Sequence, residues 1–190
     1  MSSSARLSKR EEIDMDKIIE RFLPKQEEQG IALAAASDVL KLIPLRCVDG
    51  PAQHFIAQFN CHGFVEVHGQ IRKAEHFEVG IFFPDHYLRE ANAFEVLTWL
   101  NPPSVFHPNI RPPFICVGEQ FLRPGTPLVE ILYQLHSIIR FAKWAAHSPL
   151  NEAAAQWARN NQHLLPADRR PLKRRSLDLQ ISLSAPRGQA

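Results

Sequence analysis

The 190-residue sequence has few cysteines, little net charge and no long apolar run, and each of these shortages excludes a class of protein. The three cysteines, Cys47, Cys61 and Cys116, form no Cys-x-x-Cys pair, which argues against a zinc ribbon and a disulfide framework. Scattered free cysteines favour a reducing compartment, so the expected location is the cytoplasm. No stretch approaches the roughly 18 apolar residues that a membrane span needs. Residues 1–6 contain no apolar signal core, so no secretion signal is expected.

Neither the net charge nor the histidines indicate a particular partner or a metal site. A formal net charge of +2 does not by itself indicate nucleic acid as a partner. The basic run at residues 169–175 is expected to be part of a solvated, flexible tail over 166–190, with nucleic-acid binding as the less favoured reading. The nine histidines show no His-Glu-x-x-His or similar spacing, so neither a metal site nor a cofactor is expected.

Helical spacing of apolar residues occurs near both ends of the chain. It predicts a helix over residues 11–23 that Pro24 ends, and a second helix over 31–40 that ends before Pro44. The spacing returns after Pro127 and continues to residue 142. A last helix is expected to begin at Pro149, with Ser148 as its N-cap, and to end near residue 161.

The middle of the chain consists of short apolar or alternating runs separated by Gly and Pro, which is typical of strands. Strands are predicted at residues 42–48, 54–61, 64–67, 77–83 and 94–100, with a bulge or turn at His62-Gly63. Strands flanked by helices predict an α+β domain with a four-stranded antiparallel meander, an N-terminal helix and two C-terminal helices. The expected division is a partly helical extension over 1–25, the domain over 26–165, and the tail over 166–190.

The segment His107-Pro-Asn-Ile-Arg-Pro-Pro-Phe-Ile-Cys116 carries the most distinctive chemistry of the chain. Its His-Pro-Asn tripeptide followed by an Ile-Cys-Val triplet resembles the active-site segment of ubiquitin-conjugating enzymes. Ser148, 32 residues after Cys116, precedes Pro-Leu and resembles the Asp or Ser found at that place in the family. The resemblance covers roughly residues 30–162 and implies a UBC-like fold.

The resemblance also implies an activity, a transferase reaction with a thioester intermediate. Cys116 would accept a ubiquitin-like protein from an activating enzyme and pass it to an amine of a target protein. Asn109 would support the oxyanion or the loop that bears it, and Ser148 would face the incoming amine. His107 and Pro108 would support the loop. The implied partners are the ubiquitin-like protein, the activating enzyme and the target, with a ligase or a deconjugating peptidase in the same pathway.

These residue types suit that chemistry. A thiol of ordinary pKa, about 8.5, is already partly ionised at neutral pH, so accepting a thioester requires no strong base. Attack of an amine on the thioester passes through an oxyanion, which a neutral hydrogen-bond donor stabilises. The incoming lysine, with a reference pKa of about 10.4, must also lose a proton. A polar group at the entrance helps to orient it.

The sequence also differs from the family pattern. The interval from His107 to Cys116 is one residue shorter, residues 87–92 replace a Tyr-Pro-x-x-Pro-Pro segment, and Phe121 or Leu122 lies where a Trp is usual. These differences suggest a distant branch, such as the conjugating-enzyme-like proteins of bacterial ubiquitin-like operons, some of which serve in antiviral defence.

Other readings of the same residues remain open at this point. A catalytically inert relative would bind a ubiquitin-like protein or scaffold an assembly without forming a thioester. Cys116 would then be a small buried hydrophobe, Asn109 a turn former and Ser148 only a helix cap. Cys47 and Cys61, on predicted strands, are expected in the core.

Overall fold

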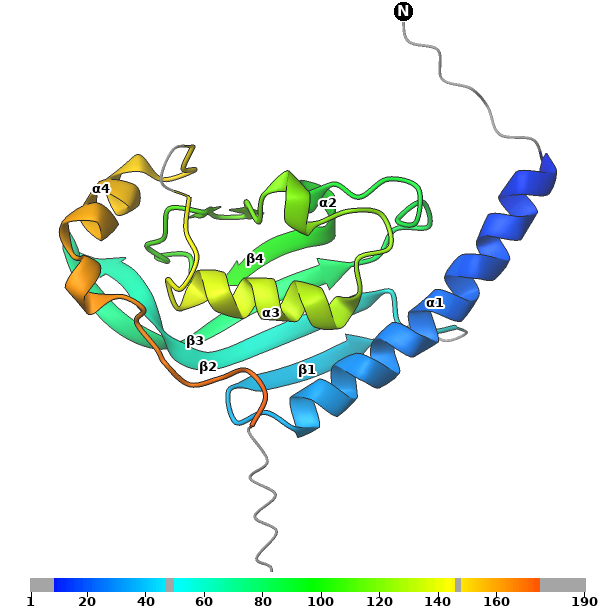
Figure 1. The fold of residues 1–190 in the computed structure, drawn as a ribbon, viewed down its shortest axis with the longest axis horizontal. Coiled ribbons are helices and arrows are strands. Elements are labelled where there is room, and N and C mark those ends of the chain that lie inside the picture. Colours follow the sequence, from blue (N-terminus) through cyan, green and yellow to red (C-terminus); the bar gives the residue numbers. More distant parts are fainter. Residues whose placement is uncertain (1–8, 47–49, 146–147, 175–190) are drawn as a thin grey trace, which may run out of the picture.

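A four-stranded antiparallel sheet forms the centre of the computed structural model, which describes residues 9–46, 50–145 and 148–174 (Figure 1). Its strands follow chain order: β1 (Leu40–Leu45), β2 (His54–Val67), β3 (Gln70–Phe82) and β4 (Leu97–Asn101). Side chains along β2 alternate between buried and more exposed positions, as expected for a sheet with one face against a core. The predicted α+β class and the four-stranded meander are therefore confirmed.

The predicted irregularity at His62-Gly63 is also confirmed, as a bulge within one continuous strand. Asn60 pairs with His76 and Gly63 pairs with Ala74, so two residues of β2 face one residue of β3. At Gly63 the sheet approaches the helix above it so closely that a Cβ atom would lie 2.9 Å from the Ile139 carbonyl oxygen. Only glycine fits this contact without displacing backbone.

The first helix, α1 (Lys9–Ala35), runs through Pro24, so the prediction that Pro24 ends it is wrong. Proline removes one backbone hydrogen bond and crowds the preceding turn. Here, buried residues on both sides of the proline, Leu23 and Leu33 among them, pack on the same core. Tertiary packing of one continuous helix face outweighs the local cost.

The predicted helix over residues 31–40 is also wrong in its second half. After Ala35 the hydroxyl of Ser37 accepts hydrogen bonds from the backbone N–H groups of Val39 and Leu40, and this turn directs the chain into β1. Val39 directly precedes β1 and Leu40 is its first residue, and both are buried in the core rather than on a helix. Pro44 lies within β1, an edge strand, where a missing N–H is tolerated.

The remaining elements frame the segment that holds the candidate residues. They are α2 (Ala93–Val96), the paired two-residue strands β5 (Ile110–Arg111) and β6 (Phe114–Ile115), the 3-10 helices η1 (Glu119–Phe121) and η2 (Gln162–Leu164), α3 (Leu128–Ile139) and α4 (Glu152–Asn160). The strand predicted at 94–100 thus begins as one turn of helix, because the Asn92 side chain caps it by accepting from the Phe94 N–H.

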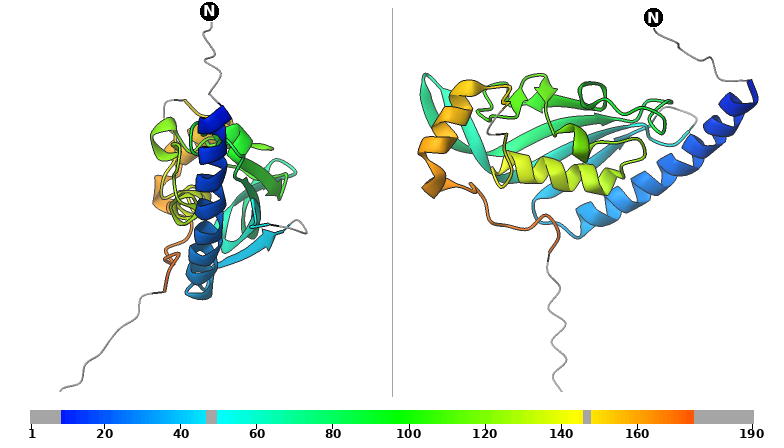
Figure 2. Two further views of the ribbon diagram at one scale, coloured as in Figure 1. Left: turned by 90° about the vertical axis from the view of Figure 1, so that its right-hand side faces the viewer. Right: turned by 45° about the horizontal axis from the view of Figure 1, so that its top comes forward.

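Helices α1 and α3 lie side by side on one face of the sheet, and α4 lies at its far end (Figure 2). The main core fills the space between the sheet and these two helices. A smaller cluster beneath α4 contains Phe64, Phe106 and Phe141. Each large apolar side chain buried in this way stabilises the fold by roughly 1.5–3 kcal/mol. None of the described helices is both long and apolar enough to cross a bilayer.

The last helix begins later than predicted, and Ser148 is not its cap. Asn151 is the N-cap of α4, and its side-chain oxygen accepts from the Ala154 N–H at 3.0 Å. Ser148 is exposed and precedes the helix by several residues. Because Asn151 caps α4, the Ser148 hydroxyl has no capping role.

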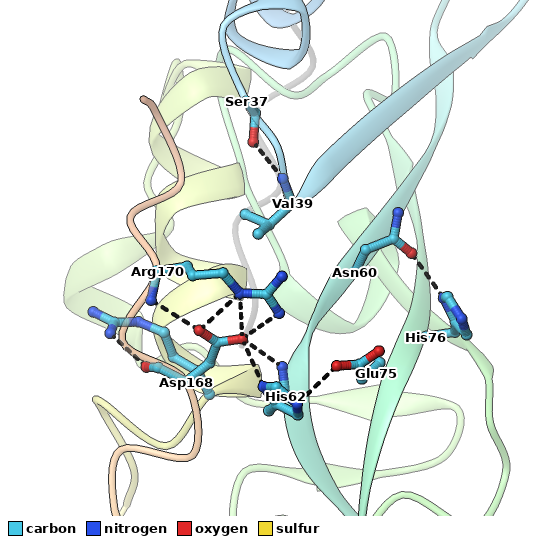
Figure 3. Close-up of polar contacts among 9 residues, drawn as sticks. Ser37, Val39, Asn60, His62, Glu75, His76, Asp168 and Arg170 are labelled. Carbon is cyan, nitrogen blue, oxygen red and sulfur yellow. Dashed lines mark hydrogen bonds and ion pairs between the residues drawn. The ribbon is translucent and has the colours of Figure 1, made fainter. Parts of the chain in front are cut away.

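Residues 166–174 fold back along the domain, so the expected flexible tail is wrong for this part of the chain. Asp168 is only 4% exposed, and its carboxylate accepts from the N–H of His62, the group left unpaired by the bulge, at 2.8 Å. Arg170 donates to the same carboxylate, and the His62 ring lies between Asp168 and Glu75 (Figure 3). Further along, Leu172 is buried in the main core. The division expected at residue 25 likewise falls inside α1.

Some predictions concern residues outside the described ranges: the end of the strand at 47–48, Cys47, His147, and residues 1–8 and 175–190. Cys61 lies in the core as expected. Burial raises the pKa of its thiol to about 12. Cys61 is therefore a hydrophobic core residue and not a nucleophile.

Candidate active site

The His-Pro-Asn segment is anchored by a buried histidine. His107 is 1% exposed and packs against the Phe141 ring, with 4.1 Å between ring centres. Its Nδ1 accepts a hydrogen bond from the Asn109 N–H at 3.0 Å. Burial lowers the pKa of His107 to about 3, against a smaller opposing effect of the Ile138 carbonyl. The ring is therefore neutral at physiological pH and serves to hold the turn, not to transfer protons.

Asn109 connects the cysteine segment to the loop between α3 and α4. Its Nδ2 donates to the Cys116 carbonyl at 2.8 Å, and its Oδ1 accepts from the Ala145 N–H at 2.7 Å. A backbone bond from the Cys116 N–H to the Asn109 carbonyl, also 2.8 Å, completes the connection. The side chain is largely buried, so its amide is occupied in positioning the residue that bears the thiol.

Pro108 supports the opposite wall of the site. Its carbonyl accepts from the N–H groups of Leu150 at 2.8 Å and Asn151 at 3.1 Å. These bonds fix the segment between Ser148 and α4 against the His-Pro-Asn turn. The carbonyl of Asn109 thus binds the cysteine segment, and the carbonyl of the preceding residue, Pro108, binds the segment that follows Ser148.

Cys116 directly follows β6 and points outward because of the alternation around it. Ile115 is fully buried and Val117 is 6% exposed, whereas Cys116 between them is partly exposed. In an extended segment successive side chains lie on opposite sides, so two buried aliphatic neighbours direct the intervening thiol away from the core. The burial of Ile115 and Val117 therefore explains why the thiol between them is accessible.

Cys116 and Ser148 line the same cleft, which has a volume of about 710 Å³. The polar residues Glu90, Asn92 and Arg123 also line it, and they come from the loops after β3 and after η1. His107 and Asn109 do not line this cleft; they support it from behind. Sequence reasoning missed Glu90 and Asn92, because nothing in their local pattern shows that the loop before α2 folds over the cysteine.

An exposed aromatic pair borders the cleft. Phe94 of α2 and Phe114 of β6 are 51% and 48% exposed, and their rings meet edge to face with centres 5.4 Å apart. They line a second hollow of about 620 Å³ that shares Phe94 and Leu150 with the cysteine cleft. Phe114 lies two residues before Cys116, so both side chains project to the same side of the extended segment.

The donor set around the cleft does not resemble a metal centre. Over residues 9–46, 50–145 and 148–174, no group of three or more His, Cys, Asp or Glu side chains is placed to hold a metal ion.

No known protein family, no curated protein and no solved structure matches this chain. The described residues form an α+β protein with a four-stranded antiparallel sheet and a partly exposed thiol in a cleft.

Proposed function

We propose that this protein is a conjugating enzyme that carries a ubiquitin-like modifier as a thioester on Cys116 and transfers it to an amine of a target protein. The observation that carries the proposal is the placement of the thiol. Of the two cysteines in the described part of the chain, Cys116 alone reaches solvent, and it does so inside a cleft. The resemblance of the His-Pro-Asn and Ile-Cys-Val motifs supplies the reaction class.

The reaction has two exchanges at one carbonyl carbon. The Cys116 thiolate attacks the thioester between the modifier and the activating enzyme, forms a new C–S bond, and releases the thiolate of the activating enzyme. An amine of the target then attacks the same carbon, the Cys116 thiolate leaves, and the amine proton passes to solvent or to a base of the target. Both steps pass through an oxyanion, so the position of Cys116 relative to nearby donors controls both.

In this proposal Asn109 is a positioning residue and Ser148 contacts the incoming amine. Both ends of the Asn109 amide are already bonded within the fold, which favours support of the loop over direct contact with the oxyanion. Ser148 is exposed in the cleft and has no capping role, so its hydroxyl is available to a substrate.

The test is a charging assay with an activating enzyme, ATP and candidate modifiers, analysed on gels with and without reducing agent. We expect a reducible adduct in the wild type, none in Cys116→Ala, and an adduct resistant to reduction in Cys116→Ser, because an oxyester replaces the thioester. Cys61→Ala is the matched control and should charge normally, because its thiol is buried. An adduct on Cys116→Ala would contradict the assignment. Binding of a modifier without any adduct would favour the inert, scaffolding relative.

A further inference from the structure

The face of the sheet that is turned away from the helices carries a patch of apolar side chains. Helices α1 and α3 cover one face of the sheet, and no described element covers the other (Figure 2). The outward residues of such a sheet are usually polar. Here they include five large apolar side chains: Ile43 and Leu45 of β1, Ile56 of β2, Phe82 of β3 and Leu100 of β4. Apolar surface gathered in one place usually marks a contact site.

Strand pairing arranges this open face in rows. Two successive rows run across β1, β2 and β3, with Leu45, His54 and Phe82 in the first and Ile43, Ile56 and Gly80 in the second. In the first row the His54 ring stacks on the Phe82 ring with 4.3 Å between ring centres. Gly80 has no side chain, and a Cβ atom there would lie 3.7 Å from Leu100 and Thr98, an ordinary contact distance. The second row therefore has a large side chain at its β1 end and a shallow hollow at its β3 end.

The next row carries opposite charges at its two ends. It consists of Lys41, Gln58 and Glu78, and the Gln58 amide donates to the Glu78 carboxylate at 2.7 Å. The backbones of Lys41 and Glu78 lie two strand spacings, or about 10 Å, apart. Within the described chain no ion pair joins these two residues. Each row thus has unlike ends, basic opposite acidic and large opposite hollow.

We propose that a second copy of this chain covers the open face, with a two-fold axis that runs along β2 between the two sheets. This rotation places β1 of each copy over β3 of the other and lays each row on the same row of the second copy. Lys41 then faces Glu78 of the second copy, and Ile43 faces the hollow at Gly80 of the second copy. Sheets pack in this way about 10 Å apart, with their strands within about 30° of each other.

The unlike ends of the rows are the reason to assign the face to a second copy and not to a different protein. A two-fold dimer uses the same surface on both subunits, so that surface must be complementary to itself. The rotation about β2 meets this requirement for charge in one row and for shape in the next. It also removes Ile56 from water, because this residue lies next to the axis and meets its own equivalent.

The test is sedimentation of the full chain over a wide range of concentrations. We expect the wild type to reach twice the 21.6 kDa mass of one chain as concentration rises. Lys41→Glu and Glu78→Lys, each alone, should raise the dissociation constant of the dimer about 10-fold or more, because like charges then meet at both contacts. An equimolar mixture of the two variants should dimerise again, because both contacts then join opposite charges. Recovery in the mixture also shows that both variants are folded.

Lys25→Glu is the matched control for this experiment. It makes the same change of charge at an exposed position of α1, on the other side of the sheet, and should leave the dissociation constant unchanged. A wild type that stays monomeric at every concentration would overturn the proposal and leave the face to a different protein. A dimer that both single variants retain, or a mixture that stays monomeric, would overturn it as well, because the copies would not then meet in this register.

Discussion

Replacing Asn109 by alanine tests whether this side chain holds the cysteine segment or acts on the reaction directly. The substitution removes two hydrogen bonds and leaves the Cys116 carbonyl and the Ala145 N–H without their partner. Each polar group left unpaired in a buried place costs about 1–3 kcal/mol, and this cost already includes the lost hydrogen bond. For two groups we therefore expect a loss of about 2–6 kcal/mol in the free energy of unfolding, or a fall of roughly 4–24 °C in Tm.

Activity should fall in a way that reflects a displaced thiol. If Asn109 positions Cys116, charging and discharge should both slow in Asn109→Ala, because both steps use the same thiol. A side chain that donates to the oxyanion only during attack of the amine would instead leave charging intact and slow discharge by about 10² to 10³. Differential scanning calorimetry gives the stability, and single-turnover assays of charging and of discharge to free lysine separate the two steps.

Asn109→Asp supplies a matched variant with nearly the same shape. The new carboxylate oxygen would face the Cys116 carbonyl, so burial and repulsion raise its folded-state pKa above the unfolded value of about 3.9. The carboxyl group can donate to that carbonyl only when protonated. The stability deficit of this variant should therefore shrink as pH falls below the raised pKa, whereas that of Asn109→Ala should not. An unchanged Tm in Asn109→Ala, with loss of discharge alone, would refute the positioning role.

Three further predictions concern other parts of the molecule. Ser148→Ala should slow discharge to lysine and change the free energy of unfolding by less than about 0.5 kcal/mol. Asn151→Ala, which removes the actual N-cap, should lower the free energy of unfolding by about 1 kcal/mol and leave the discharge rate unchanged. A stability loss in Ser148→Ala at wild-type discharge rates would remove Ser148 from the site. Burial alone would raise the pKa of Asp168, but hydrogen bonds from the Arg170 side chain and from the N–H groups of His62 and Arg170 outweigh it and hold that pKa well below its usual range. The wild type should therefore have a higher free energy of unfolding than Asp168→Asn. This difference should be full above the ordinary carboxyl pKa and should shrink as pH falls through the folded-state pKa. Urea titrations across pH 2–7 (about the range of that transition) measure the difference, and a value that does not change with pH would contradict the ion pair. Gly63→Ala should lower Tm, because the new Cβ would lie 2.9 Å from the Ile139 carbonyl oxygen; an unchanged Tm would show that α3 moves away easily.

The sheet was the most predictable part of the fold, because alternation is a local property of each strand. Residues 54–67 show the pattern and its interruption, and the structure has the strand with a bulge at that place. Pro24 shows the limit of local rules. The residues that keep α1 continuous across it are held by contacts with β1 and α3, which come later in the chain.

In the candidate site, the cysteine could be singled out by its motif, but the contacts between distant segments could not be predicted. The burial of Ile115 and Val117, which directs the thiol outward, is known only from the structure. Local sequence predicts Ser148 as the helix cap, but the cap is Asn151. The Pro108 carbonyl, from a distant segment, fixes where the chain turns into α4, and the local pattern does not show this contact. The basic stretch around Arg170 looked like a solvated tail because the bond that anchors it joins Asp168 to His62, 106 residues away.

The strap formed by residues 166–174 has a consequence for the order of events during synthesis. The N–H of His62 and the carbonyl of Ala36 belong to elements made early, and their partners, Asp168 and Arg174, are made more than a hundred residues later. Until the last segment is synthesised, the His62 N–H and the Ala36 carbonyl can bond only to water. The place in the core that Leu172 fills is also still empty at that stage. A chain stalled before residue 166 would expose this unfinished edge to chaperones and proteases, and release of the last segment would close it.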